Sequence, residues 1–81
     1  MMHQEFEWIE EIAPDMVEVM AQRFTILRYI FWTGPVGRRI LSQELGFTER
    51  FLRTETDFLK RQGLIATTRS GMIITIKGRE V

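Results

Sequence analysis

The chain contains no cysteine, so neither a disulfide framework nor a thiolate metal site is possible. Its only histidine is His3, and a metal site there would need further ligands at helical spacing, for which Glu7 is the candidate. The longest unbroken apolar run, residues 29–32, is far shorter than the roughly 20 residues of a membrane span. The first residues lack the basic flank and apolar stretch of a signal peptide. We therefore expect a cytoplasmic protein with no bound metal and no membrane contact.

The sequence also lacks the residue groupings that support catalysis. It has no recognisable nucleophile–base pair and no phosphate-binding glycine loop. Glu10 and Glu11 are sequence neighbours, so on a helix their carboxylates point in different directions and form no catalytic pair. We predict that the chain is not an enzyme and binds no cofactor.

Charge is distributed unevenly along the 81 residues, although the formal net charge is zero. Residues 1–20 contain six acidic residues and no lysine or arginine, whereas residues 21–81 contain all eleven basic residues and five acidic ones. The chain is thus an acidic segment of charge −6 joined to a basic body of charge +6. A basic body is typical of nucleic-acid binding, although acidic helices are also common as simply solvated elements.

Apolar residues at helical spacing predict two helices before residue 34. The first, residues 2–13, is an acidic helix, and its apolar stripe must pack on the same chain or on a second copy. The second helix, residues 15–33 after Pro14, should be the main core helix. The first stripe consists of Met2, Phe6, Ile9 and Ala13, and the second of Met16, Met20, Phe24, Leu27 and Phe31, widened by Val17 and Ile30.

The following residues predict a helix, a tight turn and a second helix. Residues 37–45 form a short helix that Gly46 ends, with Ile40, Leu41 and Leu45 facing inward. Thr48 is a good N-cap for the second helix, which ends at Gly63.

A two-stranded hairpin should follow. Strand-like residues 64–68 and 72–75 flank a turn at residues 69–71, and Val36 could add a short third strand. Thr75 could cap one more helix, beginning at Ile76. The predicted fold is mainly α with a small β-hairpin. It is a single winged helix-turn-helix domain over residues 1–81, with an extra N-terminal helix and a wing at residues 64–76.

The second helix of such a unit enters the DNA major groove, so its polar face is the candidate reading surface. Arginine can donate two parallel hydrogen bonds to guanine, and threonine can contact thymine or a base edge. The candidate base contacts are Thr48, Glu49, Arg50, Arg53 and Thr54.

Candidate backbone contacts surround this helix. Basic and neutral polar residues of the first helix, of the second helix's end and of the wing could reach phosphate or, at the hairpin tip, a minor groove. They are Arg38, Arg39, Ser42, Gln43, Arg61, Thr67, Thr68 and Arg69.

Glu55 conflicts with this pattern, because its helical angle falls on the apolar face. An unpaired buried carboxylate is costly. We expect a structural ion pair with an arginine of the preceding helix, Arg38 or Arg39, or with another basic residue.

Several segments resemble the DNA-binding domain of the central glycolytic genes regulators, which are SorC-type sugar-responsive repressors. The most specific are Gly37-Arg38-Arg39 and Glu49-Arg50-Phe51-Leu52-Arg53, and the resemblance covers nearly the whole chain. It implies a bacterial repressor of glycolytic genes that works as a higher oligomer on a DNA operator. It further implies a C-terminal domain, absent from this chain, that binds the inducer fructose-1,6-bisphosphate. The alternative is a winged helix that serves as a protein–protein interaction module without binding DNA.

Overall fold

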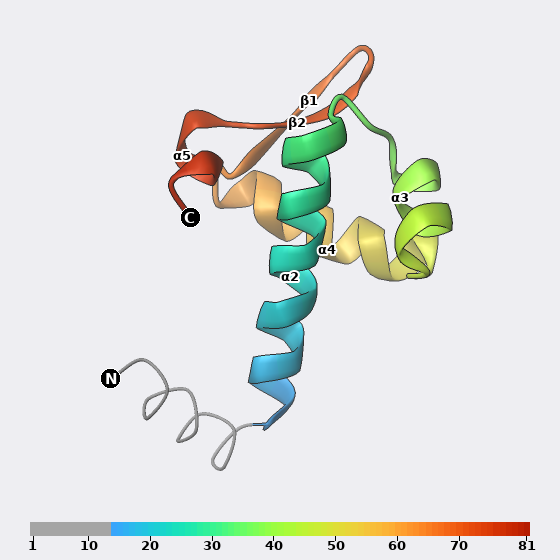
Figure 1. Ribbon diagram of the computed structural model, residues 1–81, viewed down its shortest axis with the longest axis vertical. Coiled ribbons are helices and arrows are strands. Elements are labelled where there is room, and N and C mark those ends of the chain that lie inside the picture. The colour runs from blue at the N-terminus through green and yellow to red at the C-terminus, as the bar shows by residue number, and fades with distance from the viewer. Residues whose placement is uncertain (1–13) are drawn as a thin grey trace.

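A computed structural model describes residues 14–81 of the chain (Figure 1). The predicted acidic helix at residues 2–13, with the His3–Glu7 candidate, lies outside the described residues. The elements run α2 (Pro14–Thr33), α3 (Arg38–Leu45), α4 (Glu49–Arg61), β1 (Ile65–Thr68), β2 (Gly71–Ile74) and α5 (Ile76–Arg79). This order confirms the predicted winged helix-turn-helix.

Local signals in the sequence explain the boundaries of α3 and α4. Gly46 ends α3 with a positive φ of 77° and donates its backbone N–H to the Ser42 carbonyl at 2.9 Å. Thr48 caps α4, its hydroxyl accepting from the Phe51 N–H at 3.0 Å. The Phe47 ring lies 5.1 Å from the Phe51 ring and holds the turn against α4.

The wing is an antiparallel two-stranded hairpin, and one residue from outside the hairpin forms a β-bridge with it. β1 pairs with β2 from Ile65 opposite Ile74 to Thr68 opposite Gly71. Val36 bridges Met72 through two backbone hydrogen bonds of 3.0 and 2.8 Å, as the sequence predicted. This bridge connects the segment between α2 and α3 to the wing.

The core draws on every element except α5. Its nine buried hydrophobic residues form one cluster: Ile26, Leu27, Ile30, Val36, Leu41, Leu52, Leu59, Ile65 and Met72. α2 stands in front of α4 in the view of Figure 1, with α3 on one side and α5 on the other.

The prediction of which residues of α2 and α3 face the core is partly wrong. On α2, the fully buried Ile26 was not part of the predicted stripe, whereas Met16, Phe24 and Phe31 of that stripe are exposed. The reason is that α3, α4 and the wing pack against only part of the apolar surface of α2. On α3, Leu41 is buried as expected, but Ile40 is 45% exposed, because neighbouring residues of a helix point about 100° apart and Leu41 faces the core.

Candidate nucleic-acid interface

α4 presents a sharply divided surface. Leu52, Glu55, Thr56 and Leu59 are buried in the domain, and the opposite face is polar and exposed. All five predicted base-contact residues are exposed. Arg50, Arg53 and Thr54 lie on the polar face, and Thr48 and Glu49 stand at the start of the helix. The Thr54 hydroxyl lies 3.4 Å from the Arg50 carbonyl, and its methyl remains available for an apolar contact.

Arg38 of α3 joins this face. Together with Glu49, Arg50 and Arg53 it lines a surface hollow of about 270 Å³. Within residues 14–81, ion pairs join Arg23 to Glu55 and Lys60 to Asp57, and neither involves the three arginines of the hollow. Three guanidinium groups without ion-pair partners among the described residues can donate hydrogen bonds to a phosphate or to the acceptor edge of a guanine.

The other predicted contacts lie on α3, in the wing and, for Arg61, at the far end of α4, where the neighbouring Gln62 carbonyl accepts from Lys77 of α5. Figure 1 shows the hairpin tip, α3 and the beginning of α4 on the same side of α2. Arg69 is exposed in the two-residue turn of the hairpin, between β1 and β2. The remaining exposed candidates on the α3, α4 and wing surfaces are Arg39, Gln43, Arg61 and Thr67.

Two predicted phosphate ligands already use their hydroxyl protons. Ser42 donates to the Phe47 carbonyl at 2.6 Å, and Thr68 donates to the Gly71 carbonyl at 2.7 Å. The Thr68 oxygen also accepts from the Ser70 N–H at 3.2 Å. A phosphate contact from either hydroxyl would therefore have to replace an existing hydrogen bond.

Glu55 is 7% exposed and ion-paired, as expected, and of the predicted alternatives its partner is another basic residue, not Arg38 or Arg39 of the preceding helix. Its Oε1 lies 2.6 Å from Nε of Arg23 on α2, not near Arg38 or Arg39 of α3. The guanidinium carbon of Arg23 also sits 3.8 Å from the centre of the Phe58 ring. Glu55 lies on the buried side of α4, where Arg23 reaches it from α2.

Sequence reasoning missed Arg23 as a supporting residue of the interface. The signal was present, because Arg23 lies three residues before the fully buried Ile26, on the same side of α2. Within residues 14–81, no group of three metal-ligating side chains could hold a metal ion. No helix in that range has both the length and the apolar character to cross a membrane.

Comparisons with known proteins show the family of this chain. The model of the family described as the CggR N-terminal DNA binding domain matches residues 19–81. The central glycolytic genes regulator of Bacillus subtilis (strain 168) is 45% identical over 80 residues, covering 99% of this chain and 24% of that protein. The protein of the same name from Priestia megaterium (strain DSM 319 / IMG 1521) is 47% identical over 68 residues, covering 84% of this chain and 20% of that protein. The chain thus spans less than a quarter of the length of these relatives.

Proposed function

Because the chain belongs to the CggR N-terminal DNA-binding domain family, we propose that it reads a DNA operator through the exposed face of α4. The observation that carries this proposal is the hollow formed by Arg38, Arg50 and Arg53. Its arginines come from both helices of the helix-turn-helix, so one surface can contact bases and backbone together.

We assign base reading to the exposed beginning of α4. Arg50 and Arg53 lie three residues apart and so project from the same side of the helix. Each can donate two hydrogen bonds to O6 and N7 of a guanine, and the Thr54 methyl can contact a thymine methyl. Thr48 and Glu49 stand at the helix start, where Glu49 can accept from a cytosine amino group.

We assign binding of the DNA backbone to residues outside the beginning of α4. Arg38 and Arg39 begin α3, and Gln43 follows one turn later on an exposed position. Arg61 at the end of α4 and Arg69 at the wing tip extend the contact beyond the reading helix. The remaining proposed backbone contact is Thr67. The hydroxyls of Ser42 and Thr68 would join it after rotating away from their present hydrogen bonds.

Both relatives carry the name central glycolytic genes regulator. We propose that this chain is the DNA-binding part of a bacterial repressor of glycolytic genes. It would act in the cytoplasm, where a bacterial operator lies, as a dimer or higher oligomer that reads repeated half-sites. Fructose-1,6-bisphosphate would be the inducer, acting on a part of the protein outside this chain.

A salt titration of DNA binding tests the proposal. Duplexes selected from a random pool and their scrambled versions are compared by mobility shift at several salt concentrations. Phosphate contacts release counterions, so log K should fall linearly with log salt, by about 0.9 per phosphate contacted. Selected duplexes should bind more tightly than scrambled ones at every salt concentration. Absence of any salt-dependent binding would instead favour the protein-interaction module.

A further inference from the structure

One side of α2 is apolar and is not covered by the other elements that the structure describes. Met16 is 60% exposed, Phe24 49% and Phe31 46%. Two surface hollows of about 270 and 200 Å³ run beside Phe24 and Phe31 and share Phe24, Leu27 and Val81 as lining residues. We call this continuous depression the apolar groove. Its further lining residues include Met20, Phe58 and Ile74.

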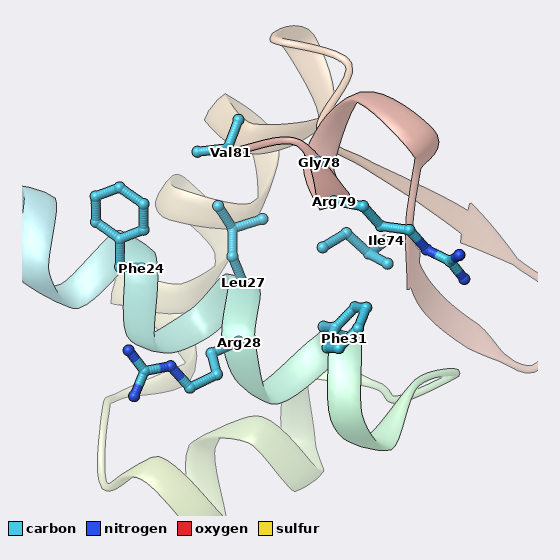
Figure 2. Close-up of a pocket in the computed structure, with 8 residues that line it drawn as sticks. All are labelled: Phe24, Leu27, Arg28, Phe31, Ile74, Gly78, Arg79 and Val81. Atoms are coloured by element: carbon cyan, nitrogen blue, oxygen red, sulfur yellow. The ribbon is translucent and has the colours of Figure 1, made fainter.

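The groove has a basic margin. Figure 2 shows Phe24, Leu27 and Phe31 projecting from α2 toward Val81 and α5, with the guanidinium groups of Arg28 and Arg79 turned outward. The guanidinium carbon of Arg79 lies 5.8 Å from the centre of the Phe31 ring. Neither arginine belongs to an ion pair within residues 14–81. A matching occupant is therefore apolar on one side and acidic beside it.

We propose that the chain's own acidic segment, residues 2–13, docks in the apolar groove. Met2, Phe6, Ile9 and Ala13 recur at helical spacing and supply the apolar stripe. The segment contains no lysine or arginine, so no like charge of its own opposes the basic margin.

Chain geometry favours docking within one chain. A helix rises about 1.5 Å per residue, so the twelve residues 2–13 span about 18 Å when folded back along α2 from Pro14. This places Phe6 beside Met20 and Met2 beside Phe24, at the near end of the groove. A tethered segment also has an effective concentration of about millimolar, well above that of a second copy at micromolar protein.

Docking there would support the reading helix. The groove is lined by Arg23 and Phe58, and Arg23 holds Glu55 of α4. The groove opens beside α5, on the other side of α2 from α3, so its occupant would not obstruct the hollow of Arg38, Arg50 and Arg53 (Figure 1).

Disulfide trapping in the full 81-residue chain tests this proposal, because the chain has no cysteine of its own. Phe6→Cys is combined with Met20→Cys in the groove, or, as the matched control, with Glu18→Cys, an exposed position of α2 at nearly the same height but on the opposite side of the helix. In a glutathione redox buffer, the groove pair should form an intramolecular disulfide with an effective concentration at least about tenfold above the control.

The products distinguish the possible occupants. A monomer with the Phe6–Met20 cross-link supports the proposal. A covalent dimer with the same pair would overturn it in favour of a second copy. Equal cross-linking of the groove pair and the control would overturn docking altogether and leave the groove to another partner.

A second measurement needs no cysteine. Phe6→Ser removes an apolar side chain from the stripe and should lower the melting temperature, whereas Gln4→Ser, on the opposite side of the predicted helix, should leave it unchanged. Equal melting temperatures for the two variants would contradict docking.

Discussion

Arg23 of α2 and Glu55 of α4 are joined by an ion pair of 2.6 Å between Nε and Oε1, although 32 residues separate them in the chain. The pair connects the core helix to the helix proposed to read DNA. Glu55 lies on the buried side of α4, so its pairing fixes which side faces outward. It thereby holds Arg50, Arg53 and Thr54 toward the solvent.

We predict that Glu55→Gln lowers the free energy of unfolding by roughly 2–4 kcal/mol. Breaking a buried ion pair typically costs about 3–5 kcal/mol, and the partial exposure of Arg23 reduces that loss. Chemical denaturation measures it. The matched control is Asp57→Asn on the same helix, whose carboxylate is half exposed and lies 3.9 Å from Lys60 Nζ. This control should cost less than about 1 kcal/mol. If both variants lost the same free energy of unfolding, the buried ion pair would contribute no more to stability than the exposed one.

Arg53→Ala should weaken binding to a selected operator by about 1–3 kcal/mol and relax the preference at one base pair. The physical reason is the loss of two hydrogen bonds to one guanine. Fluorescence anisotropy with selected and scrambled duplexes measures the change. Arg28→Ala, which removes an exposed charge from the groove side of α2, is the charge-matched control and should leave the sequence preference intact. Equal losses on both duplexes would make Arg53 a phosphate contact.

Arg69→Ala should behave differently from Arg53→Ala. A wing-tip arginine that binds phosphate contributes equally on every sequence, so affinity for selected and scrambled duplexes should fall by the same factor. The slope of log K against log salt should also become shallower by about 1. A loss confined to the selected duplex would instead place Arg69 on a base edge.

Gly71→Ala should destabilise the wing by about 1–3 kcal/mol. Gly71 has a φ of 134°, and a Cβ there would lie 2.7 Å from the backbone nitrogen of Val36, the residue that forms the β-bridge with the hairpin. Gly37→Ala is the control, because a Cβ at that position meets nothing within 4 Å. Thermal melts of both variants check the prediction. Loss of stability only in Gly37→Ala would contradict the close packing of Val36 against the wing.

The element order was predictable from the sequence because each boundary has a local cause. Thr48 and Thr75 cap their helices by side-chain hydrogen bonds to Phe51 and Gly78. Gly46 takes the left-handed conformation that ends α3. Such signals act within four residues, so they can be read without knowledge of the tertiary structure.

The partner of Glu55 and the buried face of α2 depend on tertiary packing. The helical angle showed that Glu55 is buried, but eleven basic residues were available to pair with it. The stripe from Met16 to Phe31 marks where α2 is apolar, not which part the following elements cover. The exposed Phe24 and Phe31 follow from this difference, and the apolar groove is the result.

Methylation interference tests most directly whether α4 reads bases. Methylation of guanine N7 removes one of the two acceptors that an arginine contacts in the major groove. With the parent chain, modified guanines in a selected operator should reduce binding at discrete positions. With Arg53→Ala, or separately Arg50→Ala, interference at one such guanine should disappear while the others remain. An interference pattern that is the same for the parent and both variants would contradict base reading by these arginines.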